Sequence, residues 1–227
     1  MRLIAFFLMG LVAMSADAQT TPPAGATQQR PVALVIHGGA GGIERNALSA
    51  DDEREIRAQL DRALDAGHAV LAQGGSALDA AIAAVVVLED SPRFNAGKGA
   101  VFNAEGGHEL DASLMQGHDR SAGAVAGVTT IRNPILLARA VMERSPHVML
   151  ARDGAEAFAD LQGDIARVPN SHFDTDARRE QLELARKRES AQALNELPTV
   201  AGAYFGTVGP SRSMARAASP RRPRPAA

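Results

Sequence analysis

The most constraining feature of this sequence is the stretch 80–88, which is apolar on every side of the helix that it predicts. Ser76 opens this helix, and Asp79 stands at its third position. A helix that is apolar all round is stable only where other elements cover it. We therefore expect this helix to be sandwiched between other elements, with its alanine-rich surface allowing close approach.

The segments around this helix predict further helices and strands. Residues 32–36 form a continuous apolar run, which predicts a strand buried on both faces, and the run leads into a glycine-rich loop at 37–42. Ser49 predicts the start of an amphipathic helix that Gly74 and Gly75 end. Later strands are expected at 100–103 and 108–115, joined by a turn at 104–107, and at 122–130 and 147–150; later helices are expected at 133–143 and 153–161.

Composition limits the classes of protein and partner. The chain has 227 residues, of which 45% are hydrophobic, and a formal net charge of -2, which favours one soluble globular domain with a substantial core. Nothing in this charge balance indicates a nucleic-acid partner. The absence of cysteine excludes disulfides.

The first residues predict a targeting segment. Arg2 provides a short positive region, residues 3–14 are apolar but too few to span a bilayer, and Ala16-Asp17-Ala18 gives the small-x-small cleavage pattern. We expect a signal peptide at 1–18, a flexible leader at 19–30, and a periplasmic or secreted protein without a membrane segment once the signal is removed. The alternative is a buried N-terminal helix.

Two further segments leave alternatives open. The connection 88–102 contains Pro92 and two glycines, and such an irregular path can turn carbonyl oxygens inward toward a hard cation; the alternative is a plain surface loop. Residues 178–189 are dense in charge, which indicates a solvated helix or a flexible linker. We interpret 163–201 as a mobile linker.

Several blocks of the chain, in this order, resemble plant-type (type III) L-asparaginases, also called isoaspartyl peptidases. The resemblance covers about 31–209, and a single short motif would have been weak support compared with the whole ordered series. The blocks are ALVIHGGAG at 33–41, ALDAA at 77–81, LE at 88–89, PRFNAGKGAVFN at 92–103, LDASLM at 110–115, GAVAG at 123–127, RNPI at 132–135 and GTVG at 206–209.

The resemblance implies an α/β fold, the αββα sandwich of the N-terminal-nucleophile hydrolases. It implies a precursor with an α-subunit at 31–162 and an autocleavage motif at 202–209, which cuts itself between Gly206 and Thr207. Thr207 would then be the catalytic nucleophile of a threonine-nucleophile amidohydrolase that acts on L-asparagine or β-aspartyl dipeptides. Family members assemble as (αβ)2.

The resemblance also implies residues near the nucleophile and a structural ion. No catalytic cofactor is implied. The site-adjacent residues are His37, Gly38, Gly39 and Asn95. Backbone carbonyls of the 88–102 connection would hold a structural sodium ion, and by position these belong to Leu88, Glu89, Ser91, Phe94, Ala96 and Lys98.

The final segment, 210–227, departs from the family. It is rich in proline and arginine and has no alternation of apolar residues, so we expect no central strand there. This tail favours the hypothesis of a frameshifted or truncated precursor that lacks the β-subunit. The alternatives are an inactive remnant, which could also serve as the partner of a separate β-subunit, and a relative of glycosylasparaginase or threonine aspartase.

Overall fold

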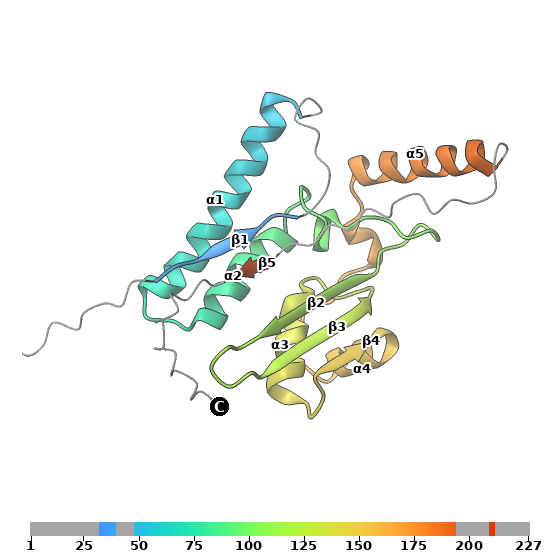
Figure 1. The fold of residues 1–227 in the computed structure, drawn as a ribbon. Coiled ribbons are helices and arrows are strands. Elements are labelled where there is room, and N and C mark those ends of the chain that lie inside the picture. Colours follow the sequence, from blue (N-terminus) through green and yellow to red (C-terminus); the bar gives the residue numbers. More distant parts are fainter. Residues whose placement is uncertain (1–31, 40–47, 194–208, 212–227) are drawn as a thin grey trace, which may run out of the picture. The chain divides into compact units, whose positions relative to one another are not determined.

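The computed structural model of the chain describes residues 32–39, 48–193 and 209–211 (Figure 1). Within these ranges helices and strands are mixed, which places the chain in the α/β class. The helices are α1 (Ala50–Ala72), α2 (Ala77–Glu89), α3 (Pro134–Arg144), α4 (Arg152–Asp160) and α5 (Asp176–Ala193), with short 3-10 turns η1 (Gly97–Gly99) and η2 (Asn170–Phe173). The strands are β1 (Val35–His37), β2 (Leu110–Met115), β3 (Ala122–Val128), β4 (Met149–Ala151) and β5 (Gly209–Ser211). None of the described helices is long and apolar enough to cross a membrane.

Helices α1 and α2 begin where the capping residues predict. Ser49 Oγ accepts a hydrogen bond from the Asp52 amide at 3.1 Å, and Ser76 Oγ accepts one from the Asp79 amide at 3.0 Å. The expected burial of α2 is confirmed, since Ala80, Ala84 and Leu88 are each 0% exposed. The local capping pattern and the apolar stripe were sufficient to define both helices.

A three-stranded sheet of order β2-β3-β4 packs on α3. Strands β2 and β3 are antiparallel, whereas β3 and β4 are parallel. Gly123 allows α3 to lie close to β3, because a Cβ there would come within 2.1 Å of the Ala138 carbonyl oxygen. This contact builds the larger hydrophobic core, in which Val125, Leu137 and Phe173 are almost fully buried.

Strand β1 is shorter and more exposed than its sequence predicts. The expected strand at 32–36, buried on both faces, is wrong: β1 begins only at Val35, and Val32 and Val35 are 51% and 48% exposed. Ile36 packs against the cluster of Ala63, Ala84, Leu88 and Phe94, whereas Val35 on the opposite face of the strand is exposed. An apolar run therefore did not by itself show how much of the strand is buried.

The partner of β1 is β5, a three-residue strand at the start of the tail, and the two form a two-stranded sheet. The two strands are antiparallel, with Val35 opposite Ser211, Ile36 opposite Pro210 and His37 opposite Gly209. Proline cannot donate a backbone hydrogen bond, but it is tolerated in a strand at a sheet edge. A short edge strand of this kind is compatible with the expectation of no central strand in the tail, of which residues 212–227 lie outside the described part of the chain.

Two other expectations differ from the structure. Residues 100–103 form no strand; they lead into a turn in which the Asn103 amide donates to the Gly107 carbonyl at 2.8 Å. The linker expected from Gly163 begins with a packed segment, since Ile165 and Val168 contact the larger core and Phe173 is 0% exposed. Only its charged part, 178–189, matches the alternative of a solvated helix, now α5.

Candidate functional site

The glycine loop after β1 contacts the 88–102 connection. A Cβ at Gly38 would lie 3.1 Å from Leu60 Cδ2 and 3.2 Å from Phe94 Cε1, so this position favours glycine. Gly39 has a φ of 123°, which side chains other than hydrogen rarely adopt. The structure therefore brings the predicted site-adjacent residues His37, Gly38 and Gly39 close to the loop that contains Asn95.

Residues 202–208 of the cleavage motif, which include Gly206 and Thr207, lie outside the described residues. What the structure describes is Gly209, two residues after Thr207 in the sequence, paired with His37 across the β1–β5 sheet. This pairing connects the chain that follows the predicted cleavage site to the predicted site-adjacent loop.

Asn95 is held inside the 88–102 connection by the backbone. Its Oδ1 accepts a hydrogen bond from the Val101 amide at 2.9 Å. The neighbouring Phe94 is 4% exposed and packs in the hydrophobic cluster of Ala63, Ala84 and Leu88. Packing on one side and a backbone contact on the other therefore fix the loop on which Asn95 stands.

The carbonyls of the same connection wrap around two glycines. A Cβ at Gly97 would lie 2.2 Å from the Glu89 carbonyl oxygen, and one at Gly99 would lie 2.2 Å from the Phe94 carbonyl oxygen. Two of the remaining candidate oxygens accept backbone hydrogen bonds: the Leu88 carbonyl from Ser91 at 3.3 Å and the Ala96 carbonyl from Gly99 at 3.1 Å. The backbone around Gly97 and Gly99 is tightly packed, and within the described residues no group of three or more His, Cys, Asp and Glu side chains could hold a metal.

The side chain of Glu89 is buried and is bound to the start of α3. It is 4% exposed, and burial raises its pKa to about 8, so the carboxyl is largely neutral near neutral pH. Its Oε1 accepts a hydrogen bond from the Ile135 amide at the start of α3. If Glu89 contributes to an ion site, it does so through its backbone carbonyl.

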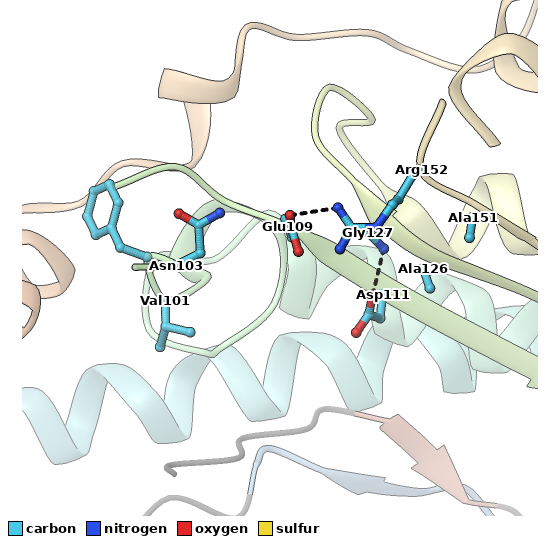
Figure 2. A pocket seen from close by; sticks show the side chains of 9 residues that line it. Val101, Asn103, Glu109, Asp111, Ala126, Gly127, Ala151 and Arg152 are labelled. Atoms are coloured by element: carbon cyan, nitrogen blue, oxygen red, sulfur yellow. Dashed lines mark hydrogen bonds and ion pairs between the residues drawn. The ribbon is translucent and has the colours of Figure 1, made fainter. Parts of the chain in front are cut away.

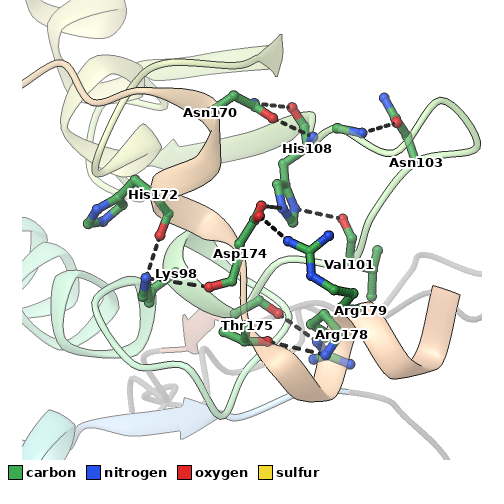
Figure 3. A network of polar contacts seen from close by, with 12 residues as sticks. Lys98, Val101, Asn103, His108, Asn170, His172, Asp174, Thr175, Arg178 and Arg179 are labelled. Carbon is green, nitrogen blue, oxygen red and sulfur yellow. Dashed lines mark hydrogen bonds and ion pairs between the residues drawn. The ribbon is translucent and has the colours of Figure 1, made fainter. Parts of the chain in front are cut away.

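A network of polar contacts, which the sequence did not indicate, joins this connection to the start of α5 (Figure 3). Lys98 Nζ donates to the His172 carbonyl at 2.6 Å, and Arg178 Nε donates to the Gly99 carbonyl at 2.7 Å. Burial, followed by the positive charge of Lys98, lowers the pKa of His172. Because these partners are separated by more than 70 residues, no local pattern could reveal them.

One cavity among the described residues is lined in part by Val101, near the end of the 88–102 connection (Figure 2). It measures about 410 Å³ and is lined by Asn103, Glu109, Asp111 and Arg152 among others, but by none of the predicted site residues. Its charged groups are engaged with each other and with the backbone: Arg152 pairs with Glu109 at 3.2 Å, and Asp111 accepts from the Gly127 amide at 2.8 Å. The predicted site and this cavity are thus lined by different residues.

A comparison with models of protein families shows to which family the chain belongs. Residues 30–211 match the family model described as asparaginase. The chain belongs to the asparaginase family. The match includes β1, the 88–102 connection and β5, which are the elements that form the candidate site.

Individual members of the asparaginase family are similar over most of this chain. The isoaspartyl peptidase of Salmonella typhimurium is 48% identical over 178 residues, which cover 78% of this chain and 56% of that relative. The isoaspartyl peptidase of Escherichia coli is 47% identical, and the match covers 78% of this chain and 55% of that relative. The human isoaspartyl peptidase/L-asparaginase is 42% identical over 176 residues, or 78% of this chain and 54% of that relative. The chain therefore spans about half the length of these relatives.

Proposed function

We propose that this member of the asparaginase family is an isoaspartyl peptidase/L-asparaginase precursor, which cleaves itself between Gly206 and Thr207. The observation that carries the proposal is the β1–β5 register, in which His37 of the glycine loop pairs with Gly209, two residues after Thr207. The names of the relatives, isoaspartyl peptidase in two bacteria and isoaspartyl peptidase/L-asparaginase in humans, favour this activity over that of a glycosylasparaginase.

The proposed self-cleavage is an acyl transfer within the chain. The Thr207 hydroxyl attacks the carbonyl carbon of Gly206, the peptide nitrogen leaves as the α-amine of Thr207, and an ester joins the two residues. Water then hydrolyses the ester, which frees the Thr207 hydroxyl and the carboxylate of Gly206. The new α-amine has a reference pKa of about 7.7–8.0 and can accept the hydroxyl proton near neutral pH.

The same hydroxyl serves the proposed reaction on substrates. Thr207 attacks the side-chain amide of asparagine, or the β-linked peptide bond of an isoaspartyl dipeptide, and ammonia or the amine leaves as it takes a proton. Water then releases aspartate from the acyl-threonine. An αββα sandwich, an (αβ)2 assembly and a periplasmic or secreted location belong to the same proposal.

Sodium held by the carbonyls of the 88–102 connection is part of the proposal. The approach of the Glu89 and Phe94 carbonyls to Gly97 and Gly99 supports it. Replacing sodium chloride with choline chloride at equal ionic strength should lower the thermal midpoint of the protein, and an unchanged midpoint would count against the ion.

Intact mass spectrometry of the full chain tests the cleavage. Wild-type protein should divide over time into two fragments that meet at Gly206 and Thr207, whereas the Thr207→Ala variant should stay intact because it has no hydroxyl. Ammonia release from L-asparagine and amine release from β-aspartyl dipeptides should accompany the cleaved form only. A wild-type chain that stays intact and releases neither product supports the alternative of an inactive remnant.

A further inference from the structure

His108 is a buried ionisable side chain that the proposed reaction does not use. Its side chain is 0% exposed and lies between two aromatic rings, with ring centroids 4.2 Å from Phe102 and 6.0 Å from Phe173. A polar ring in such a place is stable only if its nitrogens have hydrogen-bond partners. The partners of His108 therefore indicate what the residue does.

Both ring nitrogens of His108 face oxygen acceptors (Figure 3). Nδ1 lies 3.2 Å from the Val101 carbonyl, and Nε2 lies 3.0 Å from Asp174 Oδ1. A carbonyl oxygen and a carboxylate oxygen only accept, so a ring nitrogen that carries hydrogen donates to the oxygen that it faces.

The Val101 contact leads from His108 to Asn95. Val101 is held at both of its backbone polar groups: its carbonyl faces His108 Nδ1, and its amide donates to Asn95 Oδ1 at 2.9 Å. A shift of Val101 would therefore move the acceptor oxygen of Asn95. The backbone of Val101 thus contacts both the buried ring of His108 and the side chain of Asn95, the predicted site residue.

The Asp174 contact leads in the other direction, to the segment before α5. Asp174 also pairs with Arg179, and its carbonyl lies 3.5 Å from Lys98 Nζ. Arg179 in turn stacks over the Phe102 ring, with its guanidinium carbon 5.4 Å from the ring centroid. These contacts fix the carboxylate that holds His108, so the start of α5 supports the ring from the side opposite Val101.

We infer that His108 is a positioning residue: anchored by Asp174, it fixes Val101 and, through Val101, sets the orientation of the Asn95 side chain. A role for Asn95 beside the nucleophile rests on the proposed function. The series of contacts from Asp174 through His108 and Val101 to Asn95, here called the relay, does not depend on the proposed function. The two ideas can therefore be tested separately in the full-length chain.

Two substitutions of His108 separate the relay from simple packing. His108→Phe keeps an aromatic ring but removes both polar contacts, whereas His108→Gln keeps an N–H group that can donate to the Val101 carbonyl. Asp174→Asn removes the anchoring charge at nearly constant size. Ile131→Val is the control, because Ile131 is 0% exposed in the larger core and its loss of one methylene weakens packing without touching the network.

The readouts are amide hydrogen exchange at Val101 and the NMR signals of the Asn95 side-chain amide. We expect His108→Phe to accelerate Val101 exchange at least about tenfold beyond Ile131→Val when both are compared at equal global stability. We also expect shifted Asn95 signals, with a smaller effect for Asp174→Asn and partial rescue by His108→Gln. Val101 exchange and Asn95 signals that match the Ile131→Val control would overturn the inference.

The rate of cleavage at Gly206–Thr207 adds a functional readout. If the wild type cleaves itself, His108→Phe should slow cleavage about tenfold or more, because misplacing a group near the reacting bond is costly. An unchanged rate in a variant with faster Val101 exchange would overturn the positioning role. If the wild type does not cleave, the proposed function fails, and Val101 exchange and the Asn95 signals decide the inference alone.

Discussion

Glu89 caps helix α3 from a distance of 46 positions in the sequence: its Oε1 accepts a hydrogen bond from the Ile135 amide at 3.1 Å. Asn133 precedes the helix but makes no side-chain capping bond and donates instead to Asp90 Oδ1 at 3.3 Å. The second carboxyl oxygen of Glu89 is buried and has no hydrogen-bond partner within the described part of the chain. Burial is accordingly the main cause that raises the pKa of Glu89 to about 8.

The raised pKa of Glu89 predicts a loss of stability as the pH rises. The folded state retains the proton up to about pH 8, whereas the unfolded state releases it near the ordinary pKa of 4.5. Folding therefore binds a proton between these values, and the free energy of unfolding falls as the pH increases through this window. Glu89→Gln should remove this dependence and flatten the curve. Urea unfolding at several values from pH 5 to 8.5 measures it, with the exposed Glu109→Gln as control; parallel curves for wild type and Glu89→Gln would contradict the prediction.

Glu156 should show the opposite dependence on pH. Burial favours its neutral form, but hydrogen bonds from the Thr130 hydroxyl at 2.6 Å and from the Thr129 amide at 2.6 Å outweigh burial and lower its pKa. A lowered folded-state pKa stabilises the protein above the unfolded pKa, and this contribution is lost as the pH falls through the folded value. Glu156→Gln should cost about 1–3 kcal/mol at pH 7 and much less near pH 3. Denaturant titrations at both pH values test this, and an equal cost at each would count against it.

Ser76→Ala should destabilise the protein through loss of the α2 cap. Ser76 Oγ accepts from the Asp79 amide at 3.0 Å, and alanine leaves that amide without its acceptor. The expected cost is about 1 kcal/mol in the free energy of unfolding. Ser190→Ala is the matched control, because Ser190 is exposed and its hydroxyl donates only to the Arg186 carbonyl of its own helix. Equal urea midpoints for the two variants would show that the cap contributes nothing.

Gly97→Ala and Gly154→Ala should change stability in opposite directions. Gly97 has a φ of 49°, and a Cβ there would lie 2.2 Å from the Glu89 carbonyl oxygen, so alanine should cost about 2 kcal/mol or more. Gly154 lies within α4, where a Cβ would meet nothing within 4 Å, and alanine should stabilise the helix by up to about 1 kcal/mol. Thermal and urea unfolding of both variants decide the prediction, which fails if Gly97→Ala is neutral.

The sequence predicted those parts of the structure that depend on neighbouring residues. Ser49 and Ser76 each sit three positions before the residue whose amide they accept, so a local pattern was enough to place the starts of α1 and α2. The continuous apolar stripe of α2 likewise indicated its burial. The ordered motif blocks indicated the asparaginase family and the candidate residues His37 and Asn95, which the structure places on two loops joined by the Gly38–Phe94 contact.

The tertiary structure alone decided the contacts between distant segments. The Glu89 cap on α3 joins residues 46 positions apart, and the His108–Asp174 contact joins residues 66 positions apart. No periodic pattern in the sequence predicts such a pair. The type of a side chain does not show which group from a distant segment will lie beside it once both are buried. The same reason explains why Pro210 pairs with Ile36 in a strand and why residues 100–103 do not form one. Local pattern determined where α1 and α2 begin and that α2 is buried; packing determined which short strands pair and which polar groups meet.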